Sequence, residues 1–300
     1  MFNKIVAIEP IGLNQWGIDK LRELGKDVKL YEDRPNNNKE IISRVDGADC
    51  VLVSYTTLIE KEVLDKCKSI KYIGMCCSLY DEKSANVDIA AAKANGIVVT
   101  GIRDYGDEGV VAYEVSELIR LLHGFGPKQW KDRPTELTGE NIGIIGLGTT
   151  GLMVARALKA LKANVYYYSR TRKPVAEEEG IKYLPLHKLL KTVNIISTNL
   201  NKNTVLLYEE EFKLFGNNKI LINTTIGPTF SIGALKSWLN HSGNYYLCDG
   251  VGIINSEELK ELDNVICVDK VSGSSIQCTE RLSKKVIDNM LCYLEDIKMS

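Results

Sequence analysis

The stretch Asn141-Ile142-Gly143-Ile144-Ile145-Gly146-Leu147-Gly148-Thr149-Thr150-Gly151 decides the fold of this chain. A short apolar run enters a turn with the spacing G-x-G-x-x-G, and a helical pattern leaves it over residues 152–161. In such a turn Gly146 permits the tight bend, Gly148 lets a ligand approach the backbone, and Gly151 lets the helix pack close to the sheet. The stretch therefore predicts a strand, a glycine turn and a helix of a parallel α/β sheet.

The same turn predicts a dinucleotide site. A helix that starts in a glycine turn presents backbone N–H groups and the positive end of its dipole to a pyrophosphate. We expect the backbone of Gly146, Gly148, Thr149, Thr150 and Gly151 to hold it. The alternative is a glycine-rich turn that binds nothing, and the flanking strand and helix argue against it.

The end of the next expected strand indicates which dinucleotide is preferred. Sites for NAD usually carry an acid there, whereas this chain has Tyr168-Ser169-Arg170-Thr171-Arg172. Ser169, Arg170 and Arg172 can bind a 2′-phosphate, which an acid would repel. We therefore expect NADP(H), with NAD(H) possible and a solvated basic turn as the alternative.

Outward from this unit, β-branched runs alternate with helix-period segments, the pattern of parallel α/β folds. The sequence predicts two doubly wound Rossmann-like domains of the α/β class. The first domain has expected strands at 4–8, 28–31, 50–53, 72–75 and 98–100, and the second has six at 141–147, 164–168, 194–198, 219–223, 245–248 and 265–268. Residues 110–122 and 277–297 are expected helices, and the last one can return to the first domain.

Composition excludes several functions. With 38 Lys and Arg against 39 Asp and Glu, the net charge of −1 gives no field that would attract nucleic acid or an anionic membrane. No apolar run approaches the ~18 residues of a membrane helix, and the N-terminus lacks the pattern of a signal peptide. The eight cysteines show no C-x-x-C spacing, so we expect no zinc site and a reducing, cytoplasmic location.

Four stretches resemble the D-isomer-specific 2-hydroxyacid dehydrogenase family: 86–99, 137–148, 221–227 and 264–266. The resemblance implies a substrate and catalytic domain of flavodoxin-like type, residues 1–105 plus 277–300, and an NAD(P)-binding Rossmann domain, residues 106–276. It further implies a cleft between the domains, a small-molecule substrate, and a homodimer joined through the cofactor domain.

The chain departs from that family at its three catalytic positions. The arginine of the N-T-x-R-G motif is Ile226, the glutamate position falls near Ile254, and the histidine position is Lys270. His123, His187 and His241 are placed at helix ends or in a turn and are not expected to replace it. The usual 2-hydroxy acids are thus doubtful substrates.

We consider Lys270, Tyr105 and Arg103 the replacement catalytic candidates. Lys270 and Tyr105 can donate a proton, Arg103 can hold an anion, and Asp107 or Glu108 can orient Lys270. Each has a plain alternative: Lys270 as a solvated lysine, and residues 103–108 as a polar crossover with a helix cap. Positions expected to contact the cofactor are Thr198, Thr225 and Asp249.

Three functions remain open. The first is an NADP(H)-dependent oxidoreductase with a divergent substrate, a carbonyl or imine compound. The second is a catalytically silent protein that senses the cofactor, since loss of all three catalytic positions is also what such a protein would show. The third is a 2-oxo acid reductase in which Lys270 and Arg103 replace the missing groups.

Overall fold

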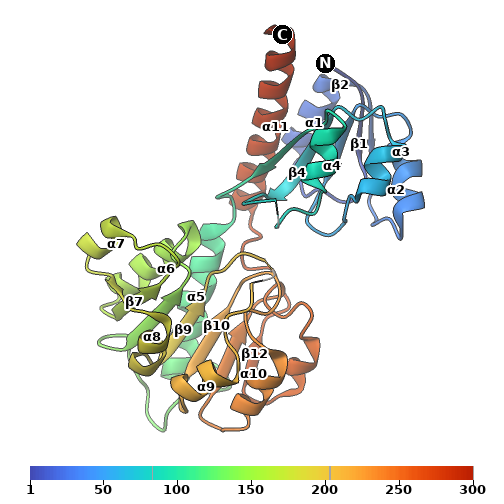
Figure 1. Cartoon of the computed structure of the whole chain (residues 1–300). Coiled ribbons are helices and arrows are strands. Elements are labelled where there is room, and N and C mark those ends of the chain that lie inside the picture. Colours follow the sequence, from blue (N-terminus) through green and yellow to red (C-terminus); the bar gives the residue numbers. More distant parts are fainter. Residues whose placement is uncertain (83, 203, 300) are drawn as a thin grey trace. The chain divides into compact units, whose positions relative to one another are not determined.

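The computed structural model describes residues 1–82, 84–202 and 204–299. Its contacts divide the chain into a first unit, Met1–Tyr105 with Ser275–Ser300, and a second unit, Gly106–Ser274. In each unit a parallel sheet is flanked by helices (Figure 1), which confirms the predicted fold class. The sequence placed the return to the first domain at residue 277, and in the structure the first unit resumes at Ser275. Ser275 caps the last helix, since its hydroxyl accepts from the Cys278 N–H at 3.0 Å.

The first unit has five parallel strands in the order β2-β1-β3-β4-β5, the flavodoxin-like arrangement. The strands are β1 (Phe2–Ala7), β2 (Gly25–Leu30), β3 (Cys50–Val53), β4 (Tyr72–Ser78) and β5 (Val98–Ile102). The helices are α1 (Gln15–Leu24), α2 (Asn38–Val45), α3 (Lys61–Lys66), α4 (Ile89–Ala94) and α11 (Ile276–Met299). α11, red in Figure 1, packs on α1, β4 and β5, and its Leu282 and Met290 join the buried cluster around Ile5 and Tyr72.

The second unit has a parallel sheet in the order β12-β11-β10-β9-β6-β7-β8. Its strands are β6 (Asn141–Ile145), β7 (Asn164–Tyr168), β8 (Lys182–Tyr183), β9 (Ile195–Thr198), β10 (Ile220–Asn223), β11 (Tyr245–Cys248) and β12 (Val265–Cys267). Its helices are α5 (Asp107–His123), α6 (Thr149–Ala160), α7 (Pro174–Glu178), α8 (Leu186–Thr192), α9 (Glu209–Phe215), α10 (Ile232–Leu239) and the 3₁₀ helix η1 (Glu257–Glu261). The expectation of six strands was wrong, because the seventh, β8, has two residues and therefore no alternating pattern to recognise.

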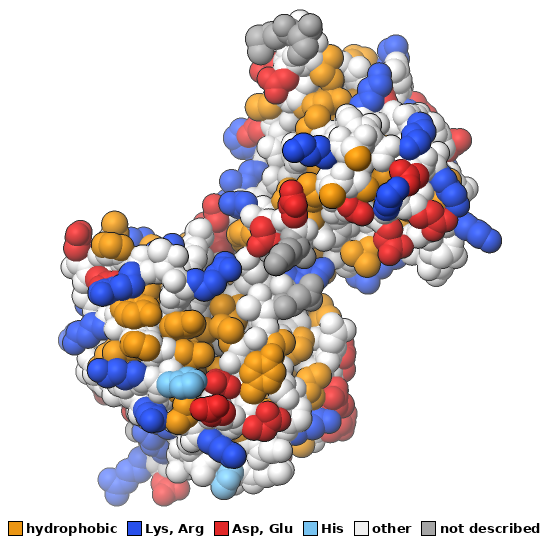
Figure 2. Space-filling view, in the orientation of Figure 1, with side chains coloured by type: hydrophobic (Ala, Val, Ile, Leu, Met, Phe, Trp, Pro, Cys, Tyr) orange, Lys and Arg blue, Asp and Glu red, His pale blue; other side chains and the backbone are white. Residues whose placement is uncertain are grey.

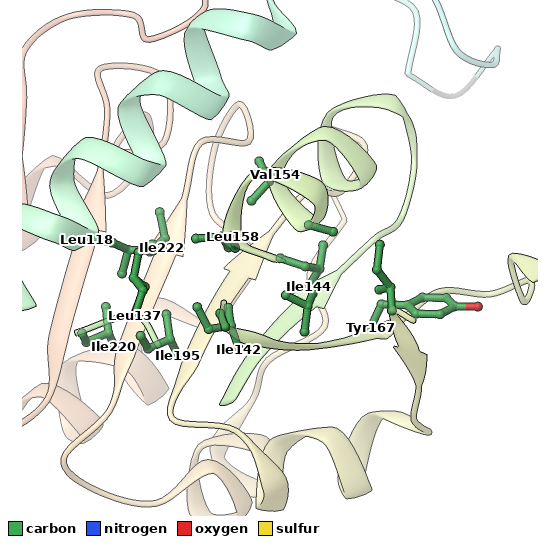
Figure 3. Close-up of a cluster of buried hydrophobic side chains, with 14 of the residues drawn as sticks. Leu118, Leu137, Ile142, Ile144, Val154, Leu158, Tyr167, Ile195, Ile220 and Ile222 are labelled. Carbon is green, nitrogen blue, oxygen red and sulfur yellow. The ribbon is translucent and has the colours of Figure 1, made fainter. Parts of the chain in front are cut away.

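A buried cluster joins this sheet to the helices over one of its faces. Figure 3 shows Leu118 of α5 with Val154 and Leu158 of α6, facing Ile142 and Ile144 of β6. Burying an aliphatic side chain of this size stabilises a fold by about 1.5–3 kcal/mol. The cluster thus anchors α6, and with it the glycine turn at the end of β6.

The surface matches the balanced charge of the sequence. On the face seen in Figure 2, basic and acidic side chains are interspersed over both units. None of the helices in the described ranges is both long and apolar enough to cross a membrane.

Candidate cofactor site

At two positions of the turn after β6, only glycine fits, because a side chain would collide with a backbone carbonyl. Gly146 has φ +96°, and a Cβ on it would lie 2.1 Å from the Asn199 carbonyl oxygen. A Cβ on Gly151 would lie 2.1 Å from the Gly146 carbonyl oxygen. Both positions therefore exclude any side chain, and the turn has the close packing that its spacing predicts.

Gly148 differs from both, because a Cβ on it would meet no described atom within 4 Å. It is the N-cap of α6 and has an ordinary φ of −81°, so neither strain nor a neighbour demands glycine here. Among the described residues no side chain caps the helix, so its first-turn N–H groups can bind an outside acceptor. Open space before a bare helix N-terminus fits a phosphate group.

The two threonines that follow have different surroundings. Thr149 is exposed, whereas the Thr150 hydroxyl donates to the Asp107 carboxylate in the first turn of α5. This bond ties the N-termini of α5 and α6 together and leaves the backbone of Thr150 as the part that a phosphate can use. Asp107 is therefore a partner of Thr150 and not the expected partner of Lys270.

The basic turn after β7 contains one arginine with an ion-pair partner and one without a partner among the described residues. Arg172 forms a two-pronged ion pair with Glu177, which also accepts from the Tyr167 hydroxyl at 2.7 Å. Arg170 is exposed and makes no hydrogen bond or ion pair with the part of the chain that the structure describes. The Ser169 hydroxyl donates to the Thr171 carbonyl at 3.0 Å. Arg170 is thus the arginine of this turn that remains available to bind a ligand.

Thr198 and Thr225 connect the ends of β9 and β10. The Thr198 hydroxyl is fully buried, 3.0 Å from Asn223 Oδ1, and accepts from the Thr229 hydroxyl at 3.1 Å. The Thr225 hydroxyl donates to the Thr198 carbonyl at 3.3 Å and accepts from the Leu200 N–H at 3.2 Å. Both threonines therefore shape the loops at the carboxyl edge of the sheet, and Thr198 does so from inside the protein.

Asp249, directly after β11, is also fully buried. One carboxylate oxygen accepts from the N–H groups of Val251 and Gly252 at 3.2 and 2.8 Å. The other accepts from the Ser272 N–H and hydroxyl at 2.8 and 2.6 Å. A carboxylate has about four acceptor positions, and these four hydrogen bonds occupy them. Its structural role is to hold the loops after β11 and β12 together.

The three catalytic candidates belong to different units. Lys270 lies in the second unit, exposed, and its backbone carbonyl accepts from the Gly250 N–H at 2.8 Å. Arg103 and Tyr105 lie in the first unit. Arg103 donates to the carbonyls of Leu79 and Tyr80 at 2.7 and 2.8 Å, which fixes it to the loop after β4.

Tyr105 is half-buried and packs against the apolar cluster of the first unit that contains Ile5 and Tyr72. Burial raises the pKa of its hydroxyl above the usual value, although a hydrogen bond with Ser78 opposes the shift. Arg281 of α11 donates to the Tyr105 carbonyl at 2.9 Å. A tyrosine with a raised pKa keeps its proton at neutral pH and can donate a hydrogen bond.

Glu114 is a residue that the sequence reasoning missed. Its carboxyl group is fully buried on α5 and accepts from the hydroxyls of Ser197 at 2.6 Å and Thr224 at 3.1 Å. Ser197 in turn accepts from the Asn199 side chain at 2.8 Å, beside the glycine turn. A signal existed: Glu114 lies three residues after Val111 and four before Leu118, on the apolar stripe of its helix.

The histidines lie at helix ends or in a turn. His123 is the last residue of α5 and stacks on Phe125, and His187 of α8 is 3.2 Å from Glu211. His241 is exposed in the turn after α10. Ile226, at the position where the family motif has arginine, is half-buried in the loop after β10.

The second unit contains the part of the chain that a family model matches. Residues 117–268, half of the chain, match the model described as D-isomer specific 2-hydroxyacid dehydrogenase, NAD binding domain. The chain belongs to this family. The resemblance carried by the four sequence stretches is confirmed, and the family is one of NAD(P)-dependent oxidoreductases.

Relatives and solved structures extend the match beyond the second unit. A hydroxypyruvate reductase of Blautia hydrogenotrophica is 26% identical over 97% of both chains. A glyoxylate reductase of Pyrococcus furiosus is 26% identical over 92% of this chain and 88% of that protein. The solved structure of an acyclic imino acid reductase, in complex with NADPH and D-Arg, is 25% identical with a TM-score of 0.82, covering 98% of this chain and 97% of the other.

Proposed function

We propose that this family member is an NADP(H)-dependent oxidoreductase that acts on a divergent carbonyl or imine substrate. The observation that carries the proposal is the unpaired Arg170 beside Ser169, where sites for NAD usually have an acid. The solved imino acid reductase was determined with NADPH, which supports the same preference. NAD(H) is the alternative cofactor.

The described residues fit a dinucleotide. The open space at Gly148 and the first-turn N–H groups of α6 would receive the pyrophosphate. Arg170 would bind the 2′-phosphate with Ser169, while Arg172, held by Glu177, would contribute less. When bound, NADPH supplies a hydride to an electrophilic carbon. The second unit is then the NAD(P)-binding domain and the first unit the substrate domain.

The substrate class follows from the replaced positions. Ile226 offers no guanidinium to pair with a substrate carboxylate, which disfavours the usual 2-oxo acids. In this proposal Lys270 and Tyr105 donate protons to the reduced group and Arg103 holds an anionic part of the substrate. Reduction of an imine is consistent with the substrate class named for the similar solved structure.

A specific observation also favours the alternative of a catalytically silent protein that senses the cofactor. Arg103 already donates to two backbone carbonyls, and Lys270 is exposed, so two of the three candidates show no sign of a built catalytic site. In that case the chain binds NADP(H) and turns nothing over. A small-molecule substrate then has no place in its function.

The proposal is tested first by fluorescence titration with NADPH and with NADH. A substrate screen then compares 2-oxo acids with aldehydes and ketones that lack a carboxylate, and with the imines that these carbonyl compounds form with amines. Tighter binding of NADPH together with reduction of an imine, or of a carbonyl compound without a carboxylate, supports it. Binding without turnover of any compound favours the cofactor sensor, and glyoxylate reduction that Lys270→Ala abolishes favours the 2-oxo acid reductase. Binding of neither nucleotide overturns the proposal.

We further propose a cytoplasmic homodimer joined through the second unit, with α5 contributing to the contact. Half-buried apolar residues of α5, Val111 and Val115, lie next to its buried positions and would extend such an interface. Light scattering coupled to gel filtration measures the mass directly. A mass equal to one chain of 33.5 kDa over the micromolar range would contradict this arrangement.

A further inference from the structure

Two cysteines stand directly opposite each other at the ends of neighbouring strands. Cys248 is the last residue of β11 and Cys267 the last of β12, and the parallel register pairs them. Neighbouring strands lie about 4.8 Å apart, within the range of roughly 4.4–6.8 Å that Cα atoms show in disulfides. Because the residues are in register, their side chains lie on the same face of the sheet, and both belong to one apolar cluster. The Cys267 thiol lies 3.8 Å from the Val268 carbonyl and 4.0 Å from the Asp249 carbonyl.

The two thiols are chemically unequal. Cys248 is fully buried, whereas Cys267 is partly exposed. The hydrogen bond from Cys248, with a further contribution from the Lys260 ammonium, lowers the pKa of Cys267. The same bond and burial raise the pKa of Cys248. The charged groups facing the pair are Lys260, its ion-pair partner Asp269, and Asp249.

We propose that Cys248 and Cys267 form a redox-active pair that hydrogen peroxide converts into an intramolecular disulfide. In the first step the Cys267 thiolate attacks a peroxide oxygen; an S–O bond forms, the O–O bond breaks, and water leaves after protonation. In the second step the Cys248 sulfur attacks the Cys267 sulfenic acid; an S–S bond forms, the S–O bond breaks, and a second water leaves. Two thiols are oxidised and one peroxide is reduced.

The other cysteines lack this arrangement. Burial raises the pKa of Cys50 and of Cys76 well above the usual value, so these thiols are unreactive. Cys76 and Cys77 are consecutive on β4 and point into different buried clusters, on opposite faces of the sheet. Cys292 is exposed on α11 and serves as an internal control for simple accessibility.

The pair lies at the base of loops that the cofactor site uses. Cys248 precedes Asp249, its carbonyl accepts from the Val268 N–H at 3.1 Å, and Gly250 bonds to Lys270. A disulfide would therefore connect covalently the two strand ends that Asp249 already joins through Ser272. The proposal itself does not depend on the substrate or on the cofactor preference.

Peptide mass spectrometry tests the proposal. The reduced protein is treated with hydrogen peroxide, and after quenching it is unfolded and alkylated with iodoacetamide. We expect Cys248 and Cys267 to lose alkylation together, to appear in one cross-linked peptide pair, and to recover after dithiothreitol. In Cys248→Ser the reaction should stop at a Cys267 sulfenic acid that dimedone labels. In Cys267→Ser, Cys248 should stay reduced, and Cys292→Ser should behave like the unmodified protein.

The unmodified protein alone provides a second measurement. In the folded, reduced state Cys267 should react with iodoacetamide at pH 7 faster than Cys292, although it is less exposed. Slower labelling of Cys267 than of Cys292 would overturn the nucleophilic role. So would a peroxide-treated sample in which Cys267 remains fully alkylated or is cross-linked only between chains.

Discussion

The Glu114 carboxyl group in the middle of α5 accepts a hydrogen bond of 2.6 Å from the Ser197 hydroxyl on β9. The contact is fully buried, and Thr224 after β10 donates to the other carboxyl oxygen. One side chain thus links the helix to two neighbouring strands at the carboxyl edge of the sheet, where open α/β folds bind ligands.

Glu114 should make the stability of the protein depend on pH. Burial raises its pKa from 4.5 to about 7, although the bonds from Ser197 and Thr224 oppose the shift. Between these values the folded protein holds a proton that the unfolded chain releases. The contribution of Glu114 to the free energy of unfolding is therefore largest below pH 4.5 and falls as pH rises to about 7, by up to about 3 kcal/mol.

Glu114→Gln should remove this dependence. The free energy of unfolding is measured with urea at pH 5 and pH 8. Relative to the unmodified protein, the Glu114 variant should become more stable as pH rises, while Glu117→Gln on the same helix should follow the unmodified protein. Parallel pH profiles for the Glu114 variant and the unmodified protein would contradict the assigned shift.

Gly148→Ala and Gly151→Ala should separate binding from folding. A methyl group on Gly148 enters open space, so the cost in stability is less than about 1 kcal/mol, but phosphate approach is blocked and NADPH affinity should fall at least about tenfold. A methyl group on Gly151 meets the Gly146 carbonyl and should cost about 1–3 kcal/mol. Unfolding curves and NADPH titration measure both; unchanged affinity in Gly148→Ala would argue against this site.

Arg170→Ala and Arg172→Ala form a matched pair for the cofactor preference. Loss of one charged hydrogen-bond partner costs about 1.5–3 kcal/mol, so Arg170→Ala should weaken NADPH binding about tenfold or more and leave NADH binding nearly unchanged. Arg172→Ala should have the smaller effect on NADPH, since Glu177 already holds that guanidinium. Equal losses for NADPH and NADH would show that Arg170 does not contact the 2′-phosphate.

Tyr113→Phe and Tyr246→Phe should differ in stability. The Tyr113 hydroxyl is buried without a hydrogen-bond partner among the described residues, so its removal should be neutral or stabilise by about 1 kcal/mol. The Tyr246 hydroxyl donates to the Gly252 carbonyl at 3.0 Å, and its removal should cost about 1–2 kcal/mol. Thermal unfolding of both variants checks this, and equal destabilisation would point to an unrecognised partner of Tyr113.

The sequence was most informative where a short segment determines its own structure. The glycine turn and the alternation of strands and helices predicted the fold class, since both signals are local. The two-residue β8 and the site network required the folded chain. Asp249 and Ser272 are 23 residues apart, and no spacing rule connects them. The pair of Arg172 and Glu177 is only five residues apart and could have been noticed as a competitor for the phosphate.

The first unit is assembled from both ends of the chain, and this has a consequence for synthesis. On the ribosome, the strands of that unit emerge before the second unit. Leu282, Val286 and Met290 of α11, which complete one of its apolar clusters, emerge after it. At 5–20 residues per second the intervening second unit takes on the order of ten seconds or more to make. During that time one face of the nascent first sheet lacks the part of its cover that α11 supplies, which makes it a natural target for chaperones.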